Sequence, residues 1–143
     1  LAFYVSSESI DKTIIQFYTP GRKINIELPM QPNGYLGGHY VLGHVDAKAK
    51  VSKILAGEKA WFFNIDVPAE FVNYIVYKGS IAINGISLTI NKVVNNTIEL
   101  CIIPVTIEKT NMSLLKEGDL VNIEFDILAK YTEQLLNKRA QNV

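Results

Sequence analysis

The sequence predicts an all-β fold, a small antiparallel barrel or sandwich, followed by one C-terminal helix. Three observations support this prediction. Short alternating segments are separated by tight turns. A stretch near the start of the chain is repeated near its end. The tail from Ile127 places Leu128, Tyr131, Leu135 and Leu136 on one helical face. Strands this short and regularly spaced argue against a βαβ fold.

Strands are expected where apolar and polar residues alternate. Besides a central hairpin, the segments are 1–6, 23–28, 39–55, 59–67, 97–103 and 119–125. Asn95-Asn96 predicts a tight turn, because asparagine tolerates positive φ. Short helical turns are expected over 7–13, capped by Ser7 or Ser9, over 68–75 with Pro68 at the first position, and over 105–115.

The central hairpin is Lys78–Ile90, with its turn at Asn84-Gly85. In its second strand Ile86, Leu88 and Ile90 share one face. Ser87 and Thr89 share the other face, which is either solvated or a small hydrogen-bonding surface.

Composition limits the classes of function. The 143 residues suffice for one domain or two very small ones. Lys plus Arg and Asp plus Glu both number 14, so the net charge of zero argues against a nucleic-acid or anionic membrane surface. No apolar run reaches the roughly 18 residues of a membrane helix. The single cysteine, Cys101, is predicted to be a buried, unreactive thiol, and its solitary presence suggests a cytoplasmic protein.

Metal binding is not predicted. His39 and His44 lie five positions apart on an expected strand, which would place their rings on opposite faces, and no third ligand is evident nearby. Glu124 and Asp126 end the last predicted strand, where carboxylates are usually solvated.

The repeat is specific. Residues 3–28 align without gaps on residues 100–125 at a constant offset of 97, and seven of the 26 positions are identical. Chance would give one or two matches. The identical pairs are Ile10/Ile107, Lys12/Lys109, Thr13/Thr110, Gly21/Gly118, Asn25/Asn122, Ile26/Ile123 and Glu27/Glu124. The chain is therefore predicted to carry the last third of one unit and then a full copy. We expect the numbering to begin partway into a longer protein.

Three motifs carry a family resemblance: GGHYVLGHVD (37–46), YKGSIAINGISLTI (77–90) and IIPVTIEKTNMSLLKEGDLVNIEFDILAKY (102–131). In this order and spacing the chain resembles riboflavin synthase from about Tyr4 to Tyr131. The resemblance implies a duplicated six-stranded antiparallel Greek-key barrel, the first copy incomplete, plus a C-terminal helix that joins three chains as a homotrimer. The implied domains are 1–33 for the partial N-terminal lumazine-binding barrel, 34–126 for the complete C-terminal one and 127–143 for the oligomerisation helix.

The resemblance also implies the reaction. Two molecules of 6,7-dimethyl-8-ribityllumazine dismutate to riboflavin and 5-amino-6-ribitylaminopyrimidinedione, a transferase reaction that uses no metal and no organic cofactor. The site lies between the N-barrel of one chain and the C-barrel of the next, where two stacked lumazines meet. Such proximity can contribute up to ~7–11 kcal/mol. The resemblance further implies an association with lumazine synthase.

Site residues follow from the matched motifs. The implied catalytic residues are His44, Ser87, Thr89 and Asp126, with His44 as a proton carrier. The implied substrate-binding residues are Val5, Ser6, Ser7, Glu8, Ser9, Gly43, His44, Val45, Lys78, Gly85, Ile86, Ser87, Leu88, Thr89, Ile102, Ile103, Pro104, Val105 and Thr106. Leu42 and Val105 depart from the family, which often has a small hydroxyl residue at the first position and a polar residue at the second.

Two other functions compete with the enzyme. One is a non-catalytic lumazine or flavin carrier on the same fold, and the intact GGHxxxGH and GISLT motifs favour the enzyme over it. The other is a small oligonucleotide-binding barrel, which zero net charge and the lack of a basic-aromatic stripe disfavour. Because the start of the first barrel is missing, we expect the chain as numbered to bind ligand but to show little synthase turnover.

Overall fold

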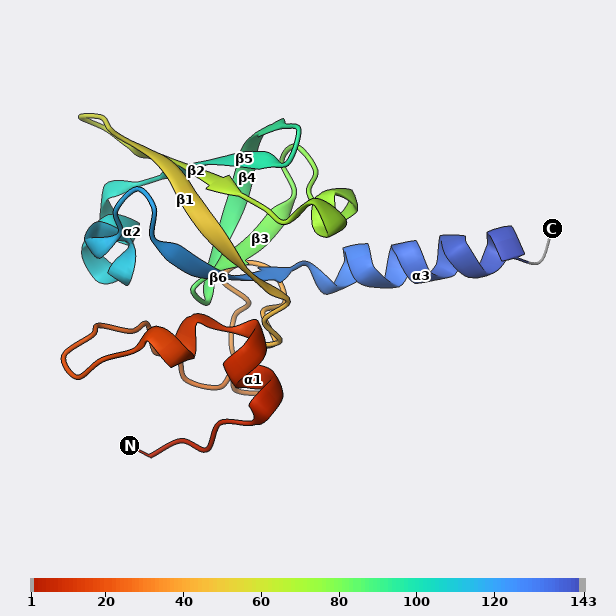
Figure 1. Ribbon diagram of the computed structural model, residues 1–143, viewed down its shortest axis with the longest axis horizontal. Coiled ribbons are helices and arrows are strands. Elements are labelled where there is room, and N and C mark those ends of the chain that lie inside the picture. Colours follow the sequence, from red (N-terminus) through yellow and green to blue (C-terminus); the bar gives the residue numbers. More distant parts are fainter. Residues whose placement is uncertain (1, 142–143) are drawn as a thin grey trace.

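Six strands close into one barrel in the computed structural model, which describes residues 2–141 (Figure 1). The strands are β1 (Ala47–Ala56), β2 (Trp61–Asp66), β3 (Ser80–Ile83), β4 (Ile86–Val94), β5 (Thr97–Ile102) and β6 (Leu120–Phe125). Their order around the barrel is β1-β2-β5-β4-β3-β6, and all six neighbouring pairs are antiparallel. Strands β3, β4 and β5 are consecutive neighbours and β6 returns to lie beside β3, so the connectivity is that of a Greek key. The predicted all-β barrel is confirmed, and the sandwich alternative is excluded.

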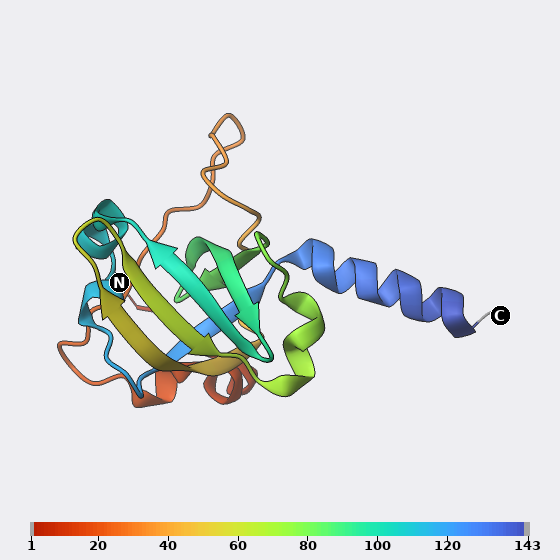
Figure 2. The same cartoon turned by 90° about the horizontal axis from the view of Figure 1, so that it is seen from above.

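Figure 2 shows the strands wrapped around the interior of the barrel. Alternate side chains of these strands fill that interior. Ile81 and Ile83 of β3 and Ile123 of β6 are completely buried, and their neighbours along each strand point outward. Asn84 and Gly85 join β3 to β4 with φ angles of 49° and 80°, as a type I′ turn requires. The predicted hairpin is therefore confirmed, and in the structure Ile83 pairs with Ile86.

The two repeated segments form the same helices at equivalent positions. Helix α1 (Ser7–Lys12) and the 3-10 helix η1 (Ile14–Phe17) lie 97 positions before α2 (Pro104–Lys109) and η3 (Asn111–Leu114), residue for residue. The cap of α1 differs from the prediction. Ser6, not Ser7 or Ser9, is the N-cap, because its Oγ accepts a hydrogen bond from the Ser9 N–H.

Two equivalent asparagines exchange contacts between the repeated segments. Asn122 Oδ1 accepts a hydrogen bond from the N–H of Ile14, the first residue of η1, at 2.8 Å. Asn25 Oδ1 accepts one from the N–H of Asn111, the first residue of η3, also at 2.8 Å. Each segment thus provides a hydrogen-bond acceptor for an N–H group at the start of a 3-10 helix in the other segment, which has no acceptor within its own helix. The exchange fastens residues 14–25 to the outside of the barrel beside β6.

Three predicted strand segments are wrong. Residues 2–6 and 23–28 form no strand, although β6, the equivalent of 23–28, pairs with β1 and β3. No described segment pairs with 23–28, and a strand without a neighbour has no ladder to stabilise it. Residues 39–46 are extended but unpaired, since Gly43 adopts a φ of 79° and the Glu124 side chain occupies the local N–H groups. Leu1 lies outside the described residues.

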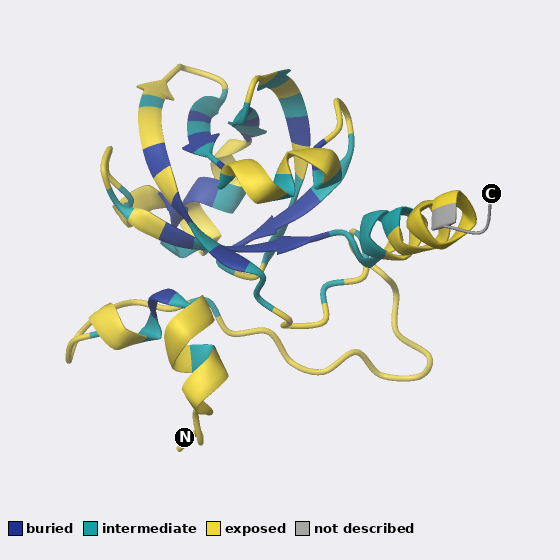
Figure 3. Cartoon of the chain, turned by 45° about the vertical axis from the view of Figure 1, so that its right-hand side comes forward, coloured by how far each residue is buried: buried dark blue, intermediate teal, exposed yellow. Residues whose placement is uncertain are grey.

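The C-terminal helix α3 (Ile127–Gln141) leaves the barrel at the end of β6 and projects from it (Figure 1). The helical turn predicted over 68–75 is the 3-10 helix η2 (Ala69–Tyr74), with Pro68 as its N-cap and not as its first residue. The Tyr74 hydroxyl of η2 donates a hydrogen bond to the Glu133 carboxylate of α3. The predicted apolar face of α3 is exposed, at 62–68 % for Leu128, Tyr131, Leu135 and Leu136 (Figure 3). Residues 142–143 lie outside the description. Among residues 2–141, no helix is both long and apolar enough to cross a membrane.

Candidate functional site

A loop segment, residues 37–46, crosses the outside of the barrel over β4, β3 and β6; we call it the strap. Beneath it lies one outward-facing row of side chains. Strand register places Ser87 of β4 opposite Ala82 of β3, and Ala82 opposite Glu124 of β6. The strap contacts both ends of this row.

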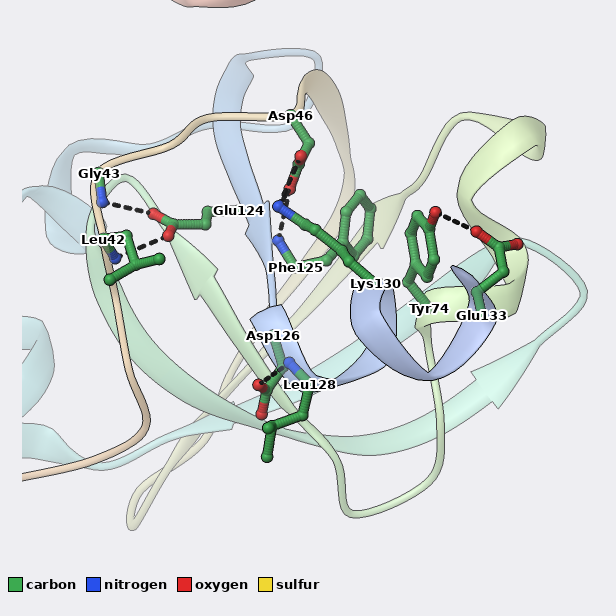
Figure 4. A network of polar contacts seen from close by, with 10 residues as sticks. All are labelled: Leu42, Gly43, Asp46, Tyr74, Glu124, Phe125, Asp126, Leu128, Lys130 and Glu133. Carbon is green, nitrogen blue, oxygen red and sulfur yellow. Dashed lines mark hydrogen bonds and ion pairs between the residues drawn. The ribbon is translucent and has the colours of Figure 1, made fainter. Parts of the chain in front are cut away.

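Glu124 holds the middle of the strap. Its carboxylate accepts hydrogen bonds from the backbone N–H of Leu42 at 2.7 Å and of Gly43 at 3.0 Å (Figure 4). The side chain is only 5 % exposed. The expectation of a solvated carboxylate is therefore wrong for Glu124. A buried carboxylate needs such donors, and here the strap supplies them.

Gly38 and His39 sit directly on Ser87. The Ser87 Oγ lies 2.8 Å from His39 Nδ1, and it accepts a longer hydrogen bond, 3.3 Å, from the His39 backbone N–H. A Cβ on Gly38 would lie 2.3 Å from the Ser87 Oγ, so only glycine allows this approach. Ser87 faces outward as predicted, but it faces the strap and not open solvent.

Asp46 anchors the end of the strap and the start of α3 together. One of its carboxylate oxygens accepts a hydrogen bond from the Phe125 N–H at 2.9 Å, and Lys130 Nζ lies 2.7 Å from the carboxylate (Figure 4). Between these anchors His44 is exposed and Val45 is half-buried. The strap therefore presents the His44 imidazole outward next to the end of β6.

A second outward row runs beside the first. Thr89 of β4 is exposed and pairs with Ser80 at the start of β3. Asp126 follows Phe125, the partner of Ile81, and its Oδ1 accepts a hydrogen bond from the Leu128 N–H at 3.0 Å, which caps α3. Ser80, Asp126, Tyr74 and the first turns of α3 line a cavity of about 550 Å³.

The remaining predicted contacts of the second barrel flank β4. Lys78 precedes β3, is exposed with a φ of 62°, and its backbone N–H donates to the Ile90 carbonyl. On the other side β5 pairs with β4 and leads into α2. Ile103 and Val105 there are exposed, and Thr106 is half-buried. Pro104 is the first residue of α2, Gly85 lies in the hairpin turn, and Ile86, Leu88 and Ile102 turn inward to the core.

The predicted residues of the first unit lie elsewhere. Val5 and Ser6 precede α1, and Ser7, Glu8 and Ser9 form its first turns. The Ser6 Oγ bonds within this segment, to the N–H and the Oγ of Ser9. Among residues 2–141, no hydrogen bond joins residues 5–9 to β4 or to the strap. The structure thus brings together the second-barrel residues and leaves those of the first unit apart.

Sequence reasoning missed three residues of this arrangement as site residues: Gly38, His39 and Glu124. The identity of Glu27 and Glu124 within the repeat was a usable signal for the last of them. Among the residues described, no group of three or more His, Cys, Asp and Glu side chains could hold a metal ion. Cys101 is half-buried on the outer face of β5 and not fully buried as predicted.

Comparison with known proteins defines the class. Residues 42–126, which include all six strands, match the family described as the lumazine binding domain. The chain therefore belongs to the lumazine-binding family of riboflavin synthases. It is 40 % identical over 132 residues to a riboflavin synthase of Photobacterium phosphoreum, covering 92 % of this chain and 61 % of that protein. It is 36 % identical over 138 residues to the riboflavin synthase of Bacillus subtilis (strain 168), covering 96 % and 64 %. The chain thus spans less than two thirds of the length of these relatives.

The fold has solved counterparts. LumP in complex with riboflavin superimposes with a TM-score of 0.77 and 26 % identity, covering 82 % of this chain and 64 % of LumP. LumP in complex with 6,7-dimethyl-8-(1'-D-ribityl) lumazine superimposes with a TM-score of 0.75 at 24 % identity, which bears on the fold alone.

Proposed function

We propose that this chain contributes to riboflavin synthesis by dismutation of two 6,7-dimethyl-8-ribityllumazine molecules to riboflavin and 5-amino-6-ribitylaminopyrimidinedione. The observation that carries the proposal is the outer face of β4. There Ser87 and Thr89 stand between the exposed Lys78 on one side and the exposed start of α2 on the other. These polar and apolar groups suit a flat heterocycle with a polar ribityl chain.

The chemistry needs proton transfer as well as binding. The 7-methyl group of one lumazine loses a proton while the other lumazine is attacked by a nucleophile, and a four-carbon unit then passes between them. We assign proton transfer to His44, which the strap presents outward. Ser87 and Thr89 hold the heterocycle. Asp126, at the end of β6, serves the ring and ribityl region besides capping α3.

The rest of the substrate contacts are proposed from position. Lys78, Gly43 and Val45 frame the second-barrel pocket with the segment Ile102–Thr106. Val5–Ser9 line the partner pocket, on the other side of the inter-barrel site. Stacking two substrates between barrels turns a bimolecular step into an effectively unimolecular one, worth up to ~7–11 kcal/mol.

The assembly is proposed with the function. The exposed apolar face of α3 suits burial against other copies, and we propose a homotrimer. We also propose a cytoplasmic location, which the single free cysteine favours, and an association with lumazine synthase.

A carrier is the second candidate, and the similarity to LumP favours it, since LumP was solved in complex with riboflavin. Turnover separates the two candidates. The protein that contains this chain is incubated with 6,7-dimethyl-8-ribityllumazine without added cofactor, and riboflavin is followed by its absorbance. We expect riboflavin to form, and little of it from the chain as numbered. Saturable lumazine binding with no riboflavin would favour the carrier, and no binding would overturn both.

A further inference from the structure

His39 is the residue of the strap that forms hydrogen bonds with Ser87. We propose that His39 is a positioning residue: its Nδ1–H holds the Ser87 Oγ so that the Ser87 hydroxyl is left as a hydrogen-bond donor to the ligand. The inference rests on the proposed function, because it takes Ser87 as a ligand contact. It adds to that function the direction of the hydrogen bond and the residue that sets it.

The Ser87 hydroxyl can make only a limited number of hydrogen bonds. A serine Oγ has one donor hydrogen and two acceptor lone pairs. The His39 backbone N–H uses one lone pair at 3.3 Å. His39 Nδ1, at 2.8 Å, then either accepts the Ser87 hydrogen or donates to the second lone pair. Only the second arrangement leaves the Ser87 O–H available to another molecule.

The second ring nitrogen of His39, Nε2, distinguishes these two arrangements. His39 Nε2 is buried and has no hydrogen-bond partner among the described residues. In a neutral imidazole one nitrogen carries the hydrogen and the other accepts. If Nδ1 accepted from Ser87, Nε2 would carry a buried N–H without an acceptor, and orphaned N–H groups are rarer than orphaned acceptors. The tautomer with hydrogen on Nδ1 avoids this.

The strap fixes the position of the His39 side chain. Gly38 lets the backbone lie against Ser87, where a Cβ would come within 2.3 Å of the Oγ. Further along, Glu124 fixes Leu42 and Gly43 through two hydrogen bonds. The imidazole is therefore held by the strap on both sides of it and not by its own contact with Ser87 alone. A carbonyl oxygen or an unprotonated ring nitrogen, both present in lumazines and flavins, suits the donor that this arrangement leaves.

The test is a double-mutant cycle read by riboflavin affinity. Riboflavin fluorescence is titrated with the wild-type chain and with His39→Phe, His39→Asn, Ser87→Ala and the His39→Phe/Ser87→Ala double variant. We expect His39→Phe and Ser87→Ala each to weaken binding about 10-fold, the loss of one hydrogen bond, and the double variant to be no weaker than Ser87→Ala. His39→Asn should restore binding to within about 3-fold, because its Nδ2–H can replace the Nδ1–H.

Controls separate positioning from stability and from the proposed function. Tyr40→Ala changes an exposed side chain of the same strap and should leave affinity unchanged. The ¹⁵N spectrum of His39 in the wild type should show hydrogen on Nδ1. Wild-type affinity in His39→Phe, additive losses in the double variant, or hydrogen on Nε2 would each overturn the inference while Ser87→Ala still weakens binding. A wild-type chain that binds no riboflavin would overturn the inference and the ligand-binding function together.

Discussion

Glu124 fixes the backbone of the strap from beneath, through its side chain. Its carboxylate accepts two strap N–H groups while lying 5 % exposed, so removing either oxygen acceptor leaves a donor unpaired. Glu124 is thus a support for the segment that carries His39 and His44. Its equivalent in the other repeat, Glu27, is exposed.

Replacing this carboxylate tests the support. Glu124→Gln retains one oxygen acceptor and loses the other together with the charge. We expect the free energy of unfolding to fall by about 1–3 kcal/mol. Denaturant titration measures this loss, and amide hydrogen exchange at Leu42 and Gly43 should become faster. Glu108→Gln, on the exposed side of α2, is the matched control. Unchanged exchange at both strap amides would contradict the role.

Tyr74 provides a pH-dependent prediction. Its hydroxyl donates to the Glu133 carboxylate, and this bond, burial, and the negative charges of Glu133 and Asp46 raise the pKa of Tyr74 above the usual 10.0. A raised pKa means that the folded state retains the proton more strongly than the unfolded state. The stabilisation is therefore complete below pH 10 and is lost as the pH rises through the folded pKa of Tyr74.

Ultraviolet titration of tyrosinate detects this residue. Wild type should contain one tyrosine that ionises later than the same residue in Glu133→Gln, where the pKa of Tyr74 should fall towards 10.0. Tyr74→Phe should remove the late step. Identical titration curves for wild type and Glu133→Gln would contradict the link between η2 and α3.

At the scale of elements, the exchanged asparagines join the two repeated segments. Asn25 bonds to Asn111 and to the Asn84 carbonyl, and Asn122 bonds to Ile14. We expect Asn25→Ala and Asn122→Ala each to cost about 1–3 kcal/mol of unfolding free energy, because each leaves a helical N–H without its acceptor. Calorimetric melting measures this, with Asn33→Ala in the exposed loop as control. A loss in only one of the two variants would show that the contacts are not equivalent in energy.

The sequence predicted elements wherever local signals and neighbours agreed. The Asn84-Gly85 turn carried its own φ preference, and alternation in β4 placed Ser87 and Thr89 outside the core as observed. The strand predicted over residues 23–28 is wrong because the local pattern and the neighbouring strands disagree there. Their alternation matches that of β6, but a strand also needs a partner, and none of the described residues supplies one.

The candidate site was predictable only in part. Motifs indicated which residues of β4, α2 and the strap belong together, because these segments are fixed by the barrel. They did not show that the strap would fold back onto Ser87, nor that Glu124 would be buried under it. Both depend on contacts across 48 and 81–82 positions of sequence, which no local pattern encodes.

At the scale of the whole molecule, helix α3 has an apolar face that the barrel does not cover. Its first turns are tied down by Lys130 to Asp46 and by Tyr74 to Glu133, while its apolar face stays exposed. Such a face favours burial against other copies, the basis of the proposed homotrimer.

Analytical ultracentrifugation tests the assembly. The wild-type chain should sediment as a trimer, and Leu135→Asp should sediment as a monomer, because a charge would be buried at the contact. Gln134→Asp adds the same charge to an exposed polar position and should leave the trimer intact. A monomeric wild type, or a Leu135→Asp variant that still forms trimers, would contradict the proposal.

We propose that the ligand binds on the outer face of the barrel around β4. The most direct measurement is the change in backbone amide chemical shifts on adding riboflavin to the ¹⁵N-labelled chain. We expect the largest changes at Lys78, Ser87, Thr89 and Thr106, with none at Gly57 in the turn between β1 and β2. Changes centred on the turn at Gly57, or no saturable change anywhere, would contradict it.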